Sequence, residues 1–367
     1  MSLTPPAPTA PRRGIIAGGN FIVDTIIRVD RYPKEEMLAN ILDETPSNGG
    51  GPYNVLKDLA ALGAPFPLDA IGLVGDDNNG RWILDDCKRH DISTTGLRCV
   101  ADAPTAHTQV MTVQGTGRRT FFHHRGANRL LGRHHFDFNR CSAKLFYLGY
   151  LMLLDALDQS DDTGRSEASR VLEAAHQSGL TTVVDLVSVE HPDYRRTVVS
   201  AIPWIDHLIM NEVEAGRLLG LDLADDDRER LEAAARNILE LGVRESAIIH
   251  SPAGGVVASR RDGTHAQSAV RLPTRDFRGS NGAGDAFASG YLFGLHEDWS
   301  IDRRLQLAVC AAAMSLTDAT PSAGIRRFDD CLQLLALHGA REWSNSPASS
   351  TASPDISRSS PQRGHTL

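Results

Sequence analysis

A glycine-rich segment late in the chain, Arg278 to Gly294, constrains the fold more than any other part of the sequence. It reads RGSNGAGDAFASGYLFG, in which small residues give way to a run that suits a helix. Glycine lets the backbone turn tightly and approach a ligand closely. The first N–H groups of a helix have no acceptor within it, and they lie at the positive end of its dipole. The segment therefore predicts a loop and helix start that bind a phosphate group.

Asp285 lies in the same turn, where its negative charge would repel a phosphate. A carboxylate is useful there if it accepts the proton of a hydroxyl that attacks phosphorus. The alternative is an ordinary first-turn acid that the helix dipole favours. The glycines alone do not separate the two, because short glycine patterns are common. No Lys-Ser or Lys-Thr follows the last glycine, so the segment is not a P-loop.

Composition excludes several classes of function. The net charge of the 367 residues is −8 and the basic residues are scattered, which disfavours a nucleic-acid partner. No apolar run is long enough to span a bilayer, and the start of the chain lacks the apolar core of a signal peptide. The five cysteines are far apart and form no CxxC pair. This spacing argues against disulfides and a zinc site and favours a cytoplasmic location.

Fourteen histidines raise the question of a metal site. The adjacent pairs are His123-His124 and His134-His135. Neighbouring side chains in a strand point to opposite faces, so neither pair predicts a chelating site.

One folded domain is predicted between two tails. Residues 1–12 and 341–367 are rich in Pro, Ala, Ser and Thr and are expected to be disordered. Between them, residues 13–340 contain no linker and no internal repeat. From Lys144 onward, strand patterns alternate with helical ones. This alternation predicts an α/β fold with three α/β/α layers around a mainly parallel sheet.

Ligands of such a sheet bind at the carboxyl ends of its strands. Asp185, Asn211 and Gly282 each lie at or just after a predicted strand end, which indicates one shared site. Two segments do not follow the alternation of strands and helices. Residues of about 20–45 and 98–128 predict a small β lid with a turn at 115–117.

Three motifs closely resemble signatures of the ribokinase-like (PfkB-type) carbohydrate kinases. GAGDAF from Gly282 matches the C-terminal signature, and GGxxxNxxxxxxxLG from Gly49 matches the N-terminal one. Asn211 and Glu214 fill the two positions of the family's NxxE. For that pair, a helix cap followed by a third-residue Glu is the alternative reading.

The resemblance implies a Mg²⁺- and ATP-dependent kinase that transfers the γ-phosphoryl group to a hydroxyl of a sugar. Asp285 is then the general base, and Asn211 and Glu214 organise Mg²⁺ through water. Asp24, which spacing alone would leave exposed to solvent, becomes a sugar ligand. The other implied residues are Gly282, Ala283 and Gly284 for the anion hole, Gly49, Gly50, Asn54 and Asn128 for the sugar, and Asn211, Ser251 and Gly255 for ATP. The Gly49-Gly50 pair would hinge the lid, and pairing of lid edges makes a homodimer the expected assembly.

Several positions depart from the family pattern. Gly279 stands where relatives that use a monovalent cation carry an Asp, so dependence on K⁺ stays open. His250 and Pro252 alter the nucleotide loop. Ile22 and Gly51 replace an Asn and a Lys of ribokinase proper, so ribose is not the favoured substrate.

Two other functions remain open from the sequence. One is a nucleoside kinase of the same fold, against which the 6% aromatic content argues weakly. The other is a ligand-binding protein that has lost catalysis, against which the retained Asp285 argues. Arg118, Arg119 and Arg125 are candidates for contact with an anionic substrate, with solvent exposure or an interface as the alternative.

Overall fold

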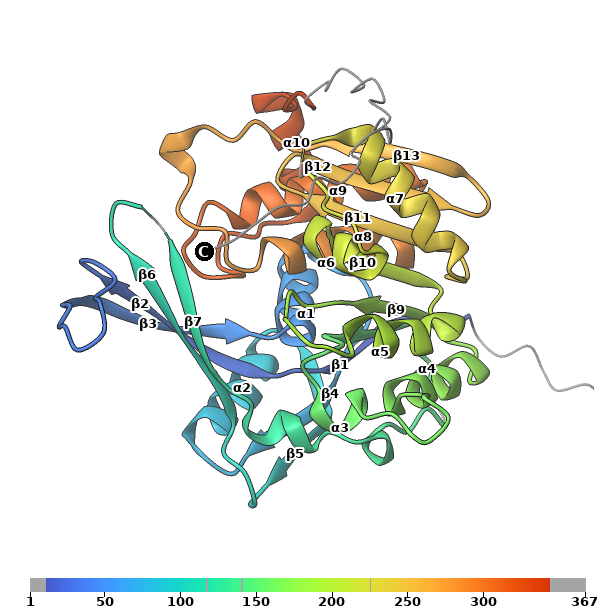
Figure 1. Cartoon of the computed structure of the whole chain (residues 1–367), viewed down its shortest axis with the longest axis horizontal. Helices are drawn as coiled ribbons and strands as arrows, with labels where there is room; N and C mark the ends of the chain where they lie inside the picture. The colour runs from blue at the N-terminus through green and yellow to red at the C-terminus, as the bar shows by residue number, and fades with distance from the viewer. Residues whose placement is uncertain (1–10, 117, 140, 225, 344–367) are drawn as a thin grey trace, which may run out of the picture.

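A large sheet organises the structure, a computed structural model that describes residues 11–343 except 117, 140 and 225. In this part of the chain the sheet has nine strands in the order β13-β12-β11-β10-β9-β8-β1-β4-β5 (Figure 1). Neighbours from β5 to β11 are parallel, and β12 and β13 are added antiparallel. The strands are β1 (Ile15–Gly19), β4 (Leu68–Gly75), β5 (Ile92–Val100), β8 (Leu145–Gly149), β9 (Thr181–Asp185), β10 (His207–Asn211), β11 (Ser246–Ser251), β12 (Gly254–Ser259) and β13 (Gly263–Ser268).

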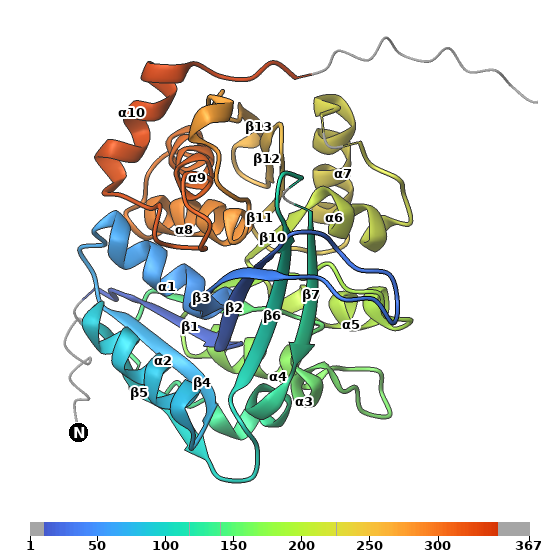
Figure 2. The same ribbon diagram turned by 90° about the vertical axis from the view of Figure 1, so that its left-hand side faces the viewer.

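Helices cover both faces of this sheet, which is why its central strands are apolar runs buried on both sides. Figure 2 shows the two helical layers to the left and right of the sheet, and each layer packs on its own hydrophobic cluster. One layer contains α1 (Gly51–Leu62), α2 (Asn78–Arg89), α8 (Ala283–His296), α9 (Ile301–Ser315) and α10 (Phe328–His338). The other contains α3 (Asp155–Asp158), α4 (Glu167–Gln177), α5 (Tyr194–Ala201), α6 (Glu212–Leu219) and α7 (Arg228–Glu240).

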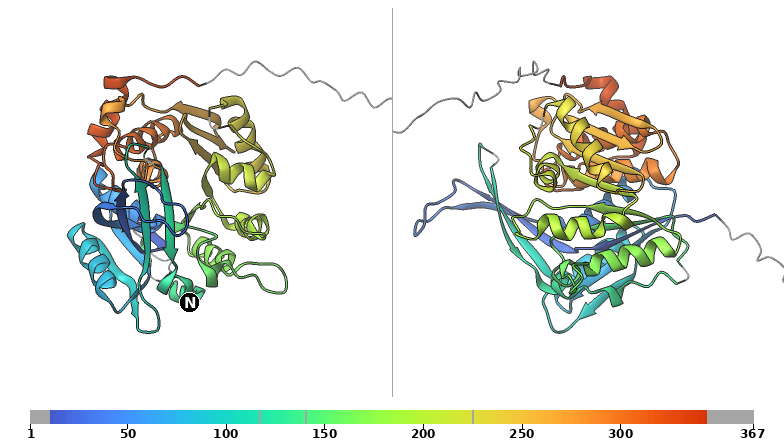
Figure 3. Two further views of the ribbon diagram at one scale, coloured as in Figure 1. Left: turned by 60° about the vertical axis from the view of Figure 1, so that its left-hand side comes forward. Right: turned by 45° about the vertical axis from the view of Figure 1, so that its right-hand side comes forward.

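A second sheet projects from one side of the molecule (Figure 3). Among the described residues it has four strands in the order β3-β2-β6-β7. They are β2 (Ile22–Val29), β3 (Ile41–Gly49), β6 (Ala106–Val113) and β7 (Arg119–His124). We call this sheet the lid sheet. The first predicted segment, 20–45, ends too early, because β3 continues to Gly49. The second, 98–128, begins too early, because residues 98–100 belong to β5 of the main sheet.

The predicted tails lie almost wholly outside the described residues, as does residue 117 of the predicted turn. At the inner ends of the tails the chain still makes ordered contacts. Arg12 donates hydrogen bonds of 3.0 Å to the carbonyls of Cys141 and Ala143, and the Arg341 N–H donates to the Ala269 carbonyl at 2.7 Å. The folded region therefore extends past 13–340 at both ends. None of the described helices is both long and apolar enough to cross a bilayer.

Helix α1 is fixed to α2 by a buried ion pair. Lys57 Nζ lies 2.8 Å from Asp86 Oδ2, and only 13% and 6% of the two side chains are exposed. The Tyr53 hydroxyl also donates to Asp86, at 2.5 Å. Because α1 begins at the glycine pair that connects it to the lid sheet, this contact holds one wall of the site described below.

We predict that Asp86→Ala lowers the free energy of unfolding by about 3 kcal/mol, because it leaves the buried Lys57 ammonium without its counter-charge. Urea denaturation measures the change. Asp85→Ala is the matched control, since Asp85 is 65% exposed and 3.6 Å from Lys88, and we expect a change below about 0.5 kcal/mol. Equal stability of the two variants would contradict the prediction.

Candidate active site

The sequence predicts an anion-binding turn at the start of α8. Gly282 has a left-handed φ of 76°, and a Cβ atom there would lie 2.5 Å from Pro321 Cβ. The first α-helical bond at this end runs from the Ala286 N–H to the Gly282 carbonyl, at 2.8 Å. The N–H groups of the preceding turn, which includes Ala283 and Gly284, have no acceptor within the helix. The Ala283 N–H is directed to the Ser280 carbonyl at 3.4 Å, which leaves the N–H groups of Gly284 and Asp285 as donors for the predicted anion hole.

Asp285 is buried in the same turn and its two carboxylate oxygens have different partners. Asn54 Nδ2 donates to Oδ2 at 2.8 Å, and the Tyr150 hydroxyl donates to Oδ1 at 2.6 Å. Burial raises the pKa of Asp285 to about 6, although both hydrogen bonds act to lower it. A carboxylate with this pKa is ionised at neutral pH and basic enough to accept a proton.

Asp24 lies on the lid sheet close to Asp285. It is only 8% exposed, and burial raises its pKa to about 7. A Cβ atom at Gly49 would lie 2.3 Å from Asp24 Oδ1, so only glycine fits beside this carboxylate. Spacing alone predicted a solvent-exposed Asp24, and that was wrong because the lid sheet turns this face toward the site. The neighbouring Gly50 has a φ of 88°, which makes it the second position where glycine is needed.

The Asn54 side chain is oriented by residues that sequence reasoning missed. Asn48 Nδ2 donates to Asn54 Oδ1 at 2.6 Å and to Ser322 Oγ at 2.9 Å. Lys57 Nζ donates to Asn48 Oδ1 at 3.0 Å. Since Asn54 Oδ1 accepts from Asn48, its Nδ2 is left to donate to Asp285. The position of Asn48 next to Gly49 was the only available signal.

Tyr150 was also missed, although it follows β8 at the carboxyl end where ligands bind. Its ring fits only because residue 51 is glycine, since a Cβ atom there would lie 2.8 Å from Tyr150 Cε1. The segment after Tyr150 is held by Asp158, which accepts the Met152 N–H at 2.9 Å and the Leu154 N–H at 2.7 Å.

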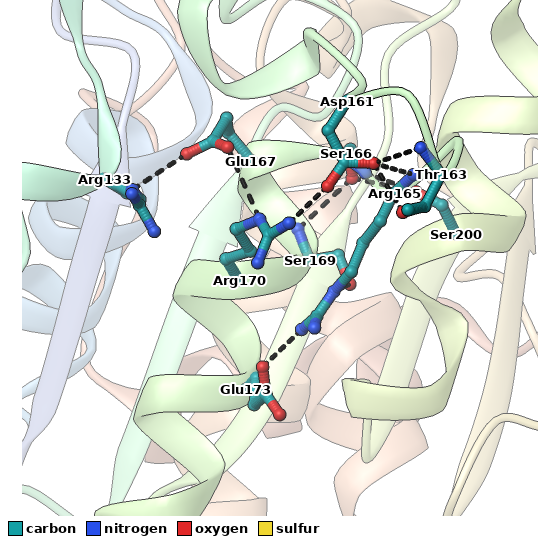
Figure 4. Close-up of polar contacts among 10 residues, drawn as sticks. All are labelled: Arg133, Asp161, Thr163, Arg165, Ser166, Glu167, Ser169, Arg170, Glu173 and Ser200. Atoms are coloured by element: carbon teal, nitrogen blue, oxygen red, sulfur yellow. Dashed lines mark hydrogen bonds and ion pairs between the residues drawn. The ribbon is translucent and has the colours of Figure 1, made fainter.

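Further along the chain, a separate network of ion pairs and hydrogen bonds joins residues 161–166 to α4 (Figure 4). Arg170 pairs with Asp161 and, at 3.4 Å, with Glu167, which also pairs with Arg133 at 3.1 Å. The Ser166 side chain caps α4 by accepting the Ser169 N–H at 3.2 Å. The segment after Tyr150 is itself held by Asp158.

A cavity of about 740 Å³ opens on the other side of the anion-binding turn. Ala283 and Gly284 line it, together with apolar side chains such as Phe287 and Val309. Ser251 also lines this cavity, as predicted for an ATP-binding residue. Gly255 does not, because it packs under Phe287, where a Cβ atom would lie 2.6 Å from the ring. Gly254 lines the cavity in its place.

Residues 15–326 of the chain match the family described as pfkB family carbohydrate kinase. The chain belongs to this family. The protein is thus a phosphotransferase that acts on a hydroxyl group of a carbohydrate, as the motifs predicted.

Curated relatives of this kinase cover nearly the whole folded region. An ATP-dependent ribose-1-phosphate kinase of Halopiger xanaduensis is 26% identical over 306 residues, which is 82% of this chain and 91% of the relative. A probable fructokinase-7 of Arabidopsis thaliana is 27% identical over 343 residues, or 88% and 92% of the two chains.

Solved structures establish the predicted fold of the kinase. A putative ribokinase II of E. coli in its apo form superposes with a TM-score of 0.72 at 18% identity, over 88% of this chain and 99% of the other. The ribokinase of Arabidopsis thaliana complexed with ribose and ATP gives a TM-score of 0.71 at 20% identity and the same coverage.

Asn211 and Glu214 of the kinase form the reciprocal cap that was the alternative to a metal site. Asn211 Oδ1 accepts the Glu214 N–H, and Glu214 Oε2 accepts the Asn211 N–H, both at 2.8 Å. Glu214 Oε1 accepts from Ser188 Oγ at 2.9 Å and from Asn211 Nδ2 at 3.0 Å. Burial raises the pKa of Glu214 to about 7. Both carboxylate oxygens of Glu214 thus accept hydrogen bonds within the protein.

Asn128, the predicted sugar ligand, is bonded to the backbone of Phe21. Its Nδ2 donates to the Phe21 carbonyl at 3.2 Å and its Oδ1 accepts the Phe21 N–H at 3.4 Å. The side chain thereby fixes the entry to β2 and positions Asp24 three residues later. The structure thus gives Asn128 a positioning role, and its contact with a sugar stays a prediction.

The histidine pairs form no metal site. His123 contacts Thr108 Oγ1 at 3.0 Å, whereas the ring of His124 stacks on His107 on the other face. His134 and His135 lie in a short helical turn (η2, Arg133–His135) and not in a strand. Among the described residues, no three His, Cys, Asp or Glu side chains are grouped so that they could hold a metal ion.

We predict that Tyr150→Phe moves the acid limb of the kcat/KM profile to higher pH. Asp285 must be ionised to accept a proton, so activity rises with pH through its pKa. Tyr150 donates to the ionised form, and losing a hydrogen bond of about 1 kcal/mol raises that pKa by about one unit. Tyr147→Phe is the matched control, because the Tyr147 hydroxyl donates to Asp185 at 3.0 Å. An unchanged limb in Tyr150→Phe would exclude this role for the phenol.

Proposed function

We propose that this pfkB kinase transfers the γ-phosphoryl group of ATP to a hydroxyl of a small sugar, with Asp285 as the general base. The carrying observation is the place of Asp285, between the anion-binding turn of α8 and the buried Asp24. The residues just before Asp285, Ala283 and Gly284, line a large cavity suited to a nucleotide, whereas its carboxylate is directed at the polar side chains of Asn54 and Tyr150.

The proposed reaction is a direct in-line transfer. The sugar oxygen forms a bond to the γ-phosphorus while the bond from that phosphorus to the bridging β–γ oxygen breaks. The electron pair of the broken bond leaves with ADP, and the hydroxyl proton passes to Asp285. The N–H groups at the start of α8 stabilise the charge on the transferring group. Asn54 holds Asp285 in place, and Asp24 accepts hydrogen bonds from the sugar.

Mg²⁺ belongs to the proposal as the partner of the ATP phosphates. When bound, Mg²⁺ would neutralise charge on the ATP phosphates. Asn211, which lines the nucleotide cavity, and Glu214, which is bonded to Asn211, would hold it through water. Gly279 supplies no carboxylate for a monovalent cation, and we propose no role for K⁺.

The relatives act on several classes of acceptor, to judge from their names. They include proteins named ribose-1-phosphate kinase, fructokinase, ribokinase and adenosine kinase. We propose a pentose, a ketohexose or one of their phosphates as the acceptor, with free ribose disfavoured by Ile22 and Gly51. Nucleosides are the second candidate class, because the adenosine kinase of Saccharomyces cerevisiae is 25% identical over 287 residues.

We predict that Asp285→Asn lowers kcat by about a hundred- to ten-thousand-fold while nucleotide affinity stays within about threefold of the wild-type value. ADP release with Mg-ATP and a panel of sugars, sugar phosphates, sugar acids and nucleosides measures kcat. Asp276→Asn is the matched control, a partly exposed acid of the preceding loop that touches neither site. Substantial activity in Asp285→Asn would remove this residue from the role of base.

The panel also tests the class of substrate. Turnover of a nucleoside in preference to every sugar would replace the proposed acceptor. ATP binding without transfer to any acceptor would support a ligand-binding protein that has lost catalysis.

We further propose a homodimer formed through the lid sheet. Its edge strand β3 exposes its first six residues, and unpaired edges invite pairing with another chain. Large apolar side chains are exposed on this sheet and its connecting loop: Tyr32, Met37, Leu38, Ile41, Leu42, Phe121 and Phe122. A second copy that covers this surface would remove both the edge and the apolar patch.

We predict that Leu38→Glu shifts the protein from dimer to monomer, because the dimer would have to bury the new charge. Light scattering after gel filtration measures the mass. Leu337→Glu is the matched control, since Leu38 and Leu337 are both 72% exposed but Leu337 lies on α10. A monomeric wild-type protein would contradict the proposed dimer.

A reducing, cytoplasmic location completes the proposal. All five cysteines lie within the described residues and are free thiols there. Buried free thiols such as Cys87 and Cys310 are compatible with a compartment in which disulfides do not form.

A further inference from the structure

Arg119, at the first position of β7, connects the lid sheet to the main body. Its Nη2 donates to Ser280 Oγ at 2.8 Å, across 161 residues of sequence. Ser280 lies two residues before Gly282, the residue that opens the anion-binding turn. A cation of the lid sheet is therefore held next to the place where the phosphoryl group would bind.

Within the described residues, no acidic side chain forms an ion pair with Arg119. Burial lowers the pKa of Arg119, and no charged neighbour contributes to that shift. Its recorded contacts are with neutral groups, the Ser280 hydroxyl and the ring of Phe121, whose centroid lies 5.7 Å from Cζ. By contrast, Arg125 is paired with Asp155, and Arg118 is exposed. A partly buried, unpaired cation is costly unless an anion joins it.

The space around Arg119 suits a small group. A cavity of about 70 Å³ lies between the lid sheet and the loop before α8. Its walls include Val110, Thr112 and Arg119 from the lid sheet, and Phe277 and Ser280 from the loop. Phe277 and Ser280 also line the large nucleotide cavity. The two cavities therefore share a wall at the loop that leads into the anion-binding turn.

The position of Arg119 along its strand decides which anion it serves. His123 marks the sugar end of β7, because it contacts Thr108, which pairs in register with Asp24. Arg119 lies four residues further out, about 13 Å along an extended strand. At that end it is bonded to Ser280, which lines the nucleotide cavity.

We propose that Arg119 is a further catalytic residue, a cation that the lid sheet brings to the γ-phosphate of ATP. This inference rests on the proposed function, since it assumes that ATP occupies the large cavity. Arginine has five N–H donors in a planar fork that matches phosphate oxygens. Ser280 uses one of them and keeps the side chain in place, and the others bind the γ-phosphoryl oxygens. The charge on those oxygens is thereby stabilised during transfer.

Binding of AMP-PNP and ADP tests this contact, because the two nucleotides differ by the γ-phosphoryl group. We expect Arg119→Ala to weaken the affinity for Mg-AMP-PNP by about tenfold and to change that for Mg-ADP less than twofold, as measured by calorimetry. We expect kcat to fall about a hundredfold. Arg119→Lys should recover part of both losses, since Lys retains the charge but not the fork. Arg118→Ala is the matched control and should leave both affinities unchanged.

Two results would overturn the inference. Equal weakening of AMP-PNP and ADP, or of neither, would show that Arg119 does not contact the γ-phosphate. An unchanged nucleotide preference with a raised KM for the acceptor would assign Arg119 to an anionic sugar instead. Circular dichroism and the thermal midpoint of each variant separate these results from misfolding. Failure of the wild-type protein to phosphorylate any acceptor would refute the proposed function, whereas the AMP-PNP and ADP comparison tests Arg119 without turnover.

Discussion

The hydrogen bond from Asn54 to Asp285 is the contact on which the site depends. It joins α1 to α8, and it is the place where the two sequence signatures of the family meet. The bond is directional because Asn48 occupies the carbonyl oxygen of Asn54 and leaves its amide nitrogen to donate. Lys57 orients Asn48 in turn, and Asp86 anchors Lys57. A buried carboxylate could otherwise rotate or take up a proton, and either change would remove the base.

Burial gives this site its chemistry. Asp24, Asp285 and Glu214 are all buried, and in each case desolvation is the main cause of a raised pKa. The same low-polarity surroundings strengthen every hydrogen bond to an incoming phosphate. In our proposal, the start of α8 provides N–H donors for that negative charge, and the lid sheet provides Arg119. The site thus combines buried acids for accepting protons with donors for binding an anion.

Much of the fold and part of the site could be predicted from sequence. The alternation of strands and helices gave the layered parallel sheet, because each element has to bury an apolar face. The motif glycines marked Gly282 and Gly50, where a left-handed φ allows little else. Asn48 and Tyr150 could not be found, because their roles arise from contacts between segments far apart in the chain. The contacts of Asn128 with Phe21 and of Gly255 with Phe287 could not be found for the same reason, since a motif position does not reveal which part of the protein lies next to it.

The contact between Gly51 and Tyr150 limits how such a site can change during evolution. Any side chain at residue 51 would place its Cβ atom 2.8 Å from the Tyr150 ring and 3.0 Å from the Tyr147 hydroxyl. A larger residue at 51 therefore becomes acceptable only after Tyr150 has been replaced by something smaller. Replacement of Tyr150 alone, however, removes a hydrogen-bond donor from Asp285, the proposed base. Substitutions at these two positions, almost a hundred residues apart, can therefore be accepted only in a certain order. A library that varies one position at a time would miss the combinations in which both residues change.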